Sequence, residues 1–122
     1  MKSVLVVDDR VYMRAALRGF LALHTDVRIC AEAADGIDAI IQAWHHRPDL
    51  VVMDLTMPRM NGLDAAAIIK NMLPATRIIM FTLNGDLAIQ APAEMVGVDL
   101  ILSKADGATG LTNALQSLLG GR

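Results

Sequence analysis

The feature that most constrains the fold is an alternation of short apolar runs with helical patterns along the whole chain. The runs Val4–Val7, Leu50–Met53 and Ile78–Phe81 are continuously apolar, as expected for strands that are buried on both faces. Between them, apolar residues recur at the spacing of one helix face. One such series is Ile37, Ile40, Ile41 and Trp44. The alternation predicts an α/β fold with a parallel sheet.

Two further segments complete the predicted sheet. Apolar and polar residues alternate in Val27–Ala33, which indicates a strand with one wetter face at an edge of the sheet. A last strand is expected at Val98–Ser103, before a final helix whose apolar residues form one stripe between Leu111 and Leu119. Because parallel strands require right-handed crossovers, the five βα units predict an open, doubly wound sheet in the order 2-1-3-4-5, with helices on both faces.

The composition limits the function classes that need to be considered. At 122 residues the chain is the size of one domain with a single core. A hydrophobic fraction of 54% and a formal net charge of −2 indicate neither a disordered chain nor a nucleic-acid-binding surface. The single cysteine, Cys30, excludes an intramolecular disulfide and fits a reducing cytosol. The first apolar run is too short for a signal peptide and no stretch reaches membrane length, so we expect a soluble intracellular protein.

Polar residues follow the predicted strands at the positions where the strands end. Asp8 and Asp9 follow the first strand, Asp54 follows the third, Thr82 follows the fourth, and Lys104 follows the fifth. The carboxyl ends of parallel strands share one edge of the sheet, and ligands bind there near the reversal of strand order. Since the first and third strands are neighbours in the predicted order, we expect the three carboxylates to converge.

Three carboxylates in one cleft repel one another unless a cation lies among them. Oxygen-only ligation favours magnesium or calcium over zinc, and a strand-end cluster with room for water and a phosphoryl group suits magnesium. Lys104 and Thr82 then have a role as a cation and a hydroxyl donor for phosphoryl oxygens. The sequence therefore predicts a site for Mg²⁺ and a phosphoryl group.

Several segments of the chain resemble the receiver domain of two-component response regulators. They are VVDDRVYMR at the start, VVMDLTMPRMNGLDA in the middle, FT at Phe81–Thr82 and SK at Ser103–Lys104. The resemblance covers essentially the whole chain and implies a single receiver domain over residues 1–122 with a flavodoxin-like fold. It implies that Asp54 accepts a phosphoryl group from a histidine kinase or a histidine phosphotransfer protein. Such a domain catalyses its own phosphorylation, loses the phosphoryl group slowly, and acts as a switch rather than as an enzyme.

The resemblance also implies a role for each residue of the magnesium site. Asp9 and Asp54 are expected to ligate Mg²⁺ directly, and Asp8 is expected to bind it through water. The backbone carbonyl of Thr56 is the third expected protein ligand.

The remaining matched residues serve phosphoryl transfer. Asp54 is expected to attack phosphorus in line, while Mg²⁺ and Lys104 offset the charge of the transferring group. Thr82 is expected to bond a phosphoryl oxygen once the acyl phosphate forms. Gly62 shapes the loop after Asp54 together with Pro58, and Asn61 is a candidate cap for the helix that follows.

Four positions depart from the usual pattern of the family. Ile101 stands where receivers commonly carry a Tyr or Phe whose inward rotation accompanies phosphorylation, so coupling from Thr82 to the surface is expected to be altered. Leu83 is bulky where the family often has a small residue, and Ala105 replaces a common proline. Pro92 interrupts the fourth helix, for which we expect a short helix over about residues 92–96 after a long loop, or a sharp kink.

The resemblance also predicts partners and leaves two alternatives open. Expected partners are the phosphoryl donor, an effector or fused output domain, and a second copy of the chain in a phosphorylation-dependent homodimer. No direct nucleic-acid or membrane contact is expected, and the cytoplasm is the expected location. One alternative is a degenerate receiver that binds partners without phosphorylation. The other is a magnesium-dependent phosphatase, against which the lack of a second domain or a long insertion argues.

Overall fold

The computed structural model describes residues 1–24, 26–83 and 87–120, and it contains a five-stranded parallel sheet in the order β2-β1-β3-β4-β5. The strands are β1 (Lys2–Val7), β2 (Val27–Ala33), β3 (Leu50–Met53), β4 (Arg77–Thr82) and β5 (Leu100–Ser103). The helices are α1 (Val11–Leu21), α2 (Gly36–His46), α3 (Gly62–Met72), α4 (Gln90–Met95) and α5 (Thr109–Leu119). The predicted fold class and strand order are confirmed.

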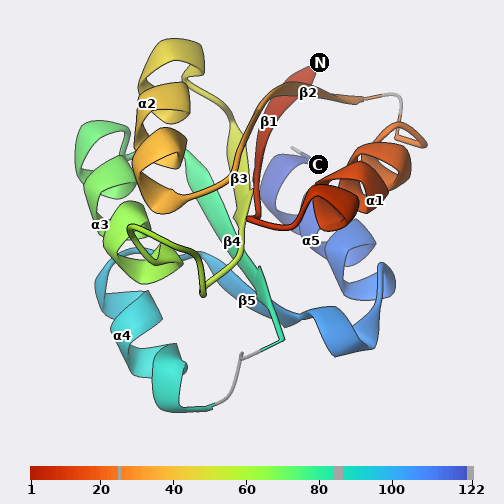
Figure 1. Ribbon diagram of the computed structural model, residues 1–122. Helices are drawn as coiled ribbons and strands as arrows, with labels where there is room; N and C mark the ends of the chain where they lie inside the picture. The colour runs from red at the N-terminus through yellow and green to blue at the C-terminus, as the bar shows by residue number, and fades with distance from the viewer. Residues whose placement is uncertain (25, 84–86, 121–122) are drawn as a thin grey trace.

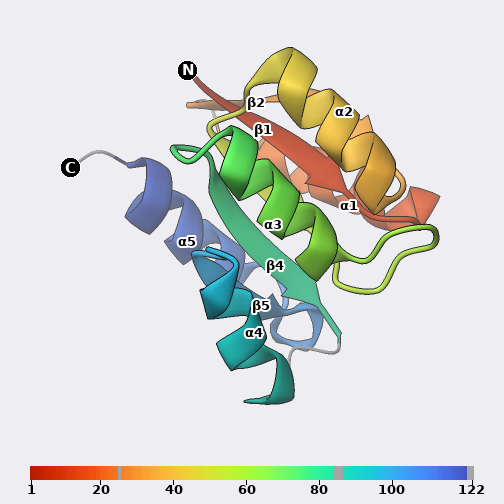
Figure 2. The same ribbon diagram turned by 90° about the vertical axis from the view of Figure 1, so that its left-hand side faces the viewer.

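Helices cover both faces of the sheet. Helices α1 and α5 lie on one face, and α2, α3 and α4 lie on the other (Figure 1). Figure 2 looks onto the face of the sheet that α2, α3 and α4 cover, so these helices lie in front of the strands. Because side chains alternate along each strand, Leu5 and Val7 of β1 enter the core under α2 to α4, while Val4 and Val6 enter the core under α1 and α5. All strand carboxyl ends meet at one edge.

The last strand and the fourth helix differ in detail from the prediction. Strand β5 begins at Leu100, two residues later than predicted, because Val98 donates its backbone N–H to the carbonyl of Ala93 in α4. Helix α4 is short as predicted, but a 3₁₀ turn over Leu87–Ile89 leads directly into it, so the predicted long loop is wrong over residues 87–91. The rest of that predicted loop, residues 84–86, lies outside the described residues.

The helix begins before Pro92 for a simple reason. Pro92 is the third residue of α4, and the N–H groups of a first turn have no partner within the helix. The missing N–H of proline therefore breaks no hydrogen bond there. Pro92 was predicted at the first helical position, but it is the third residue of α4 and still lies within the first turn.

The loop between β3 and α3 packs tightly against the end of β3. Asn61 caps α3, as predicted, by accepting a hydrogen bond from the backbone N–H of Asp64 at 2.9 Å. The N–H of Gly62 donates to the carbonyl of Leu55 at 2.7 Å. A Cβ atom on Gly62 would lie 2.2 Å from the carbonyl oxygen of Asp54, so only glycine fits this approach. The loop geometry therefore depends on Gly62.

A second anchor ties the same loop to α2. The Asp35 carboxylate accepts from the N–H of Asp38 at 2.8 Å and from Nε of Arg59 at 2.8 Å. The backbone hydrogen bond from Asp38 and then the Arg59 guanidinium hold the pKa of Asp35 below its usual value. The carbonyl of Met60 accepts from the N–H of Gly36 at 3.1 Å. These contacts hold the loop that follows Asp54 against the start of α2.

We predict opposite effects for alanine at two glycines. Gly62→Ala should lower the free energy of unfolding by roughly 1–3 kcal/mol, because the new Cβ must displace the backbone at Asp54. Gly19→Ala, in α1 with nothing within 4 Å of an added Cβ, should raise it by roughly 0.5–1 kcal/mol through helix propensity. Urea unfolding of both variants measures the difference. Equal stability of the two variants would contradict the close approach at Gly62.

Candidate functional site

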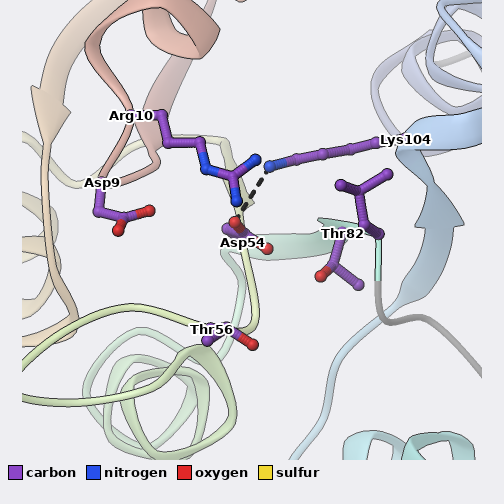
Figure 3. Close-up of a pocket in the computed structure, with 7 residues that line it drawn as sticks. Asp9, Arg10, Asp54, Thr56, Thr82 and Lys104 are labelled. Carbon is purple, nitrogen blue, oxygen red and sulfur yellow. Dashed lines mark hydrogen bonds and ion pairs between the residues drawn. The ribbon is translucent and has the colours of Figure 1, made fainter.

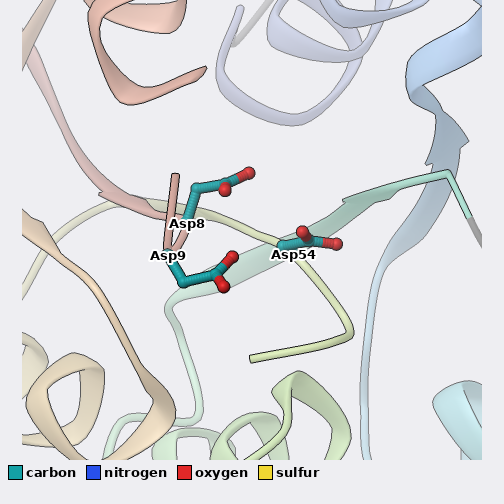
Figure 4. Close-up of side chains that lie close together, drawn as sticks. All are labelled: Asp8, Asp9 and Asp54. Atoms are coloured by element: carbon teal, nitrogen blue, oxygen red, sulfur yellow. The ribbon is translucent and has the colours of Figure 1, made fainter. Parts of the chain in front are cut away.

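Three carboxylates converge where β1 and β3 end. Asp8 and Asp9 follow β1, and Asp54 follows β3, which pairs with β1 in the sheet. One carboxylate oxygen from each of the three residues lies within 4.8 Å of the others (Figure 4). The predicted convergence is therefore present in the structure.

The ammonium group of Lys104 lies between two of these carboxylates. Its Nζ is 2.6 Å from Oδ2 of Asp8 and 3.0 Å from Oδ2 of Asp54. The Lys104 side chain is only 5% exposed, and those of Asp8 and Asp54 are 1% and 9% exposed. The sequence reading assigned compensation of the crowded charges to a metal ion. The structure shows that Lys104 supplies part of that compensation within the chain.

Backbone N–H groups orient the two buried carboxylates. The N–H of Leu55 donates to Oδ1 of Asp54 at 2.7 Å, and the N–H of Arg10 donates to Oδ1 of Asp8 at 3.0 Å. The Asp9 carboxylate differs because it is exposed and makes no hydrogen bond or ion pair with the described residues. Asp9 is thus the carboxylate most available to an incoming cation.

A cavity of about 260 Å³ opens above Asp54 (Figure 3). Its lining contains five of the residues predicted for the site and two others. They are Asp9, Asp54, Thr56, Thr82 and Lys104, with Arg10 and Leu83. Asp8 is bonded to Lys104 but does not line the cavity. Every residue predicted for the site therefore lies in this cavity or directly beside it.

The donor set fits a magnesium ion. The carboxylates of Asp8, Asp9 and Asp54 offer only oxygen atoms, and the cavity beside them leaves space for water and for phosphoryl oxygens. Thr56 lines the same cavity as Asp9 and Asp54. A hard divalent cation is the species that such a set of ligands prefers.

Two arginines near the site were not assigned to it from the sequence. Nη1 of Arg14 donates to the backbone carbonyl of Asp8 at 2.6 Å, and its Nε pairs with Glu32 at 3.3 Å. Arg14 therefore has a structural role, because it supports the loop that carries Asp8. Arg10 lines the cavity itself. The only sequence signal for Arg10 is its position directly after Asp9 at the end of a buried strand.

The positions that depart from the family pattern also have defined places. Leu83 is 58% exposed and lines the cavity beside Thr82, which is fully buried. Ile101 is partly buried and packs against the core under α2 to α4. The hydroxyl of Ser103 accepts from the N–H of Ala105 at 3.1 Å and begins a 3₁₀ turn over Lys104–Asp106. A serine cap thus stands at the turn that carries Lys104.

The family comparison matches nearly the whole chain. The model of the response regulator receiver domain matches residues 4–116. The chain belongs to the response regulator receiver domain family. Receiver domains act in signal transduction by two-component systems. The alternative of a small-molecule phosphatase is not needed to explain the site.

Known relatives agree with this assignment. The chain is 33% identical over 114 residues to the response regulator protein VraR of Staphylococcus epidermidis, covering 93% of this chain and 54% of the relative. It is 41% identical over 102 residues to a protein-glutamate methylesterase/protein-glutamine glutaminase of Pyrococcus horikoshii, covering 81% of this chain and 27% of the relative. The chain therefore spans between about a quarter and about half of the length of these relatives.

Solved structures show the same fold. A two-component response regulator of the LuxR family from Aurantimonas has a TM-score of 0.93 and 30% identity, covering 100% of this chain and 87% of that one. The response regulator domain of Thermotoga maritima CheB has a TM-score of 0.91 and 27% identity, covering 100% of this chain and 98% of that one. In the described residues, no helix is long and apolar enough to cross a membrane.

We predict that Mg²⁺ binding depends on Asp9. Asp9→Ala should weaken Mg²⁺ binding about tenfold or more, because it removes the one carboxylate of the three that no described residue engages. Titration calorimetry measures the affinity directly. Asp26→Ala is the control, since it removes an equal charge from an exposed position before β2. Undiminished affinity in Asp9→Ala would contradict the assignment.

We predict that Lys104 stabilises the domain most when divalent metal is absent. Lys104→Met keeps much of the side-chain volume but leaves Asp8 and Asp54 buried without a cation, so in EDTA it should cost about 3 kcal/mol of unfolding free energy. Mg²⁺ should recover part of this loss. Lys2→Met, at an exposed position of β1, is the control. A deficit that is the same with and without Mg²⁺ would show that Lys104 and the metal do not compensate the same charges.

Proposed function

We propose that the domain is a phosphorylation switch in which Asp54 accepts a phosphoryl group. The observation that carries the proposal is the position of the Asp54 carboxylate. It stands at the carboxyl end of β3, faces a cavity, and is bonded to Lys104 on one oxygen and to the N–H of Leu55 on the other. A carboxylate held in this way is a positioned nucleophile. The proposal covers residues 1–122 as one receiver domain.

The reaction requires a donor with a phosphorylated nitrogen or oxygen. A carboxylate oxygen of Asp54 forms a bond to phosphorus, and the bond from phosphorus to the donor breaks, with its electron pair leaving on the donor. Bound Mg²⁺ would neutralise charge on the transferring group, held by Asp9 and Asp54, by Asp8 through water, and by the carbonyl of Thr56. Lys104 and the Thr82 hydroxyl would bind phosphoryl oxygens from the other side of the cavity. The domain thus catalyses its own phosphorylation.

The side chain of Leu83 shields the acyl phosphate on Asp54 from water, which supports a switch rather than an enzyme that turns over a substrate. Leu83 lines the cavity with an exposed apolar side chain beside Thr82. Such a side chain obstructs the approach of water to the acyl phosphate, so loss of the phosphoryl group is expected to be slow. A long-lived acyl phosphate is what a signalling state requires.

The partners follow from the same chemistry. The donor is a phosphohistidine on a histidine kinase or on a phosphotransfer protein. The downstream partner is an effector or a fused output domain, since the relatives are longer than this chain. A phosphorylation-dependent homodimer belongs to the same proposal. The net charge of −2 supports no direct contact with nucleic acid or with a membrane surface. The single cysteine excludes an intramolecular disulfide, which suits the reducing cytoplasm.

The proposal predicts one labelled site per chain. Incubation with acetyl phosphate and Mg²⁺ should add a single phosphoryl group, seen by intact-protein mass spectrometry, and Asp54→Asn should abolish it. Asp64→Asn, on the exposed first turn of α3, is the matched control and should label like the unmodified chain.

Each alternative gives a different result in the same experiment. A degenerate receiver would show no label on the unmodified chain. A phosphatase would release phosphate in large excess over the protein without retaining a label on Asp54. Either result would contradict the proposed switch.

A further inference from the structure

Arg10 lines the cavity above Asp54, but the site as described so far gives it no role. Arg10 directly follows Asp9 and lines the cavity together with Asp54, Thr82 and Lys104. Figure 3 shows its guanidinium group turned toward Asp54 and toward the tip of Lys104. Arg10 and Lys104 therefore bring positive charge to the same space from different elements, the end of β1 and the end of β5.

The main chain of Arg10 is held by hydrogen bonds to neighbouring residues. Its N–H donates to Asp8 at 3.0 Å, and its carbonyl accepts from the N–H groups of Met13 and Arg14, both at 3.1 Å. Arg10 is thereby held as the residue that precedes α1. Within the described chain, its guanidinium group makes no ion pair or side-chain hydrogen bond.

This behaviour differs from that of other arginines near carboxylates. Arg14 and Arg18 pair with Glu32, Arg59 pairs with Asp35, and Arg77 pairs with Asp99. Arg10 stands beside an acidic cluster yet pairs with none of its members. Its position over the cavity leaves the planar set of N–H donors available to an anion, and a phosphoryl group matches that set.

We propose that Arg10 binds a phosphoryl oxygen during transfer to Asp54 and in the resulting acyl phosphate. The proposal rests on the proposed function, because it requires Asp54 to be the acceptor. Arg10 changes no covalent bond and gives up no proton. It adds a charge-assisted hydrogen bond beside that of Lys104, so that two cationic groups meet the negative charge on the phosphoryl oxygens.

The same charge should act in the opposite direction on the metal. A guanidinium group that reaches the rim of the acidic cluster repels a divalent cation there. Removing it should therefore leave Mg²⁺ affinity unchanged or raise it, while phosphoryl binding falls. A residue with a merely structural role would change both affinities in the same direction.

The test measures Mg²⁺ affinity by calorimetry, and then, at saturating Mg²⁺, the affinity for beryllium fluoride and the rate of labelling by acetyl phosphate. Arg10→Ala should weaken beryllium fluoride binding and slow labelling about ten- to a hundredfold, as expected for loss of one charge-assisted hydrogen bond. Arg10→Lys should recover part of both. Arg28→Ala is the control, because it removes an equal charge from an exposed position at the start of β2, away from the cavity.

Two results would overturn the assignment of Arg10. One is Arg10→Ala with unchanged beryllium fluoride affinity and labelling rate. The other is a parallel loss of Mg²⁺ and beryllium fluoride affinity, which would indicate a distorted loop. Failure of the proposed function looks different, because the unmodified chain would then bind no beryllium fluoride and take no label, and both proposals would fall.

Discussion

The ion pairs from Lys104 to Asp8 and Asp54 connect the end of β5 to the ends of β1 and β3. Lys104 follows β5 at one edge of the sheet, while Asp8 and Asp54 follow β1 and β3 near its middle. Buried carboxylates without a cation would carry a large desolvation penalty, and the buried ammonium group offsets it. The arrangement therefore holds the acceptor carboxylate and its charge partner in place before any ligand arrives.

The two segments beside these ion pairs differ in how firmly they are anchored. The loop after Asp54 is held by Gly62, by the Asn61 cap and by the pairing of Arg59 with Asp35. Lys104 instead stands on a short 3₁₀ turn, and a phosphoryl group would compete with Asp8 for its ammonium group. A redistribution of that one charge is thus a route by which phosphorylation could alter the β5 end of the molecule.

Much of the fold was predictable because it depends on periodicity. Continuous apolar runs located β1, β3 and β4, and the alternation in Val27–Ala33 located the edge strand β2. Because the site residues lie at or just after the strand ends, their place on one edge of the sheet was predictable as well. The start of α4 was misplaced because the position of Pro92 within a first turn depends on helix geometry that spacing alone does not reveal.

The sequence predicted which residues form the site, but not which of their atoms are in contact. Sequence order could show that Asp8 and Lys104 share an edge, yet not that their charged atoms lie 2.6 Å apart, because that distance depends on packing between residues far apart in the chain. Arg10 was missed since a lone arginine after two acidic residues ordinarily indicates a solvated surface. The consequence expected for Ile101, a weaker coupling from Thr82 to the surface, stays a prediction.

A double-mutant cycle between Asp8 and Lys104 tests the central claim most directly. Unfolding free energies of the unmodified chain, Asp8→Asn, Lys104→Met and the double variant are compared in EDTA. The buried ion pair predicts a favourable coupling energy of about 1–3 kcal/mol, which should shrink when Mg²⁺ is added. Additivity of the two substitutions in EDTA, to within about 0.5 kcal/mol, would contradict the claim that this pair holds the site together.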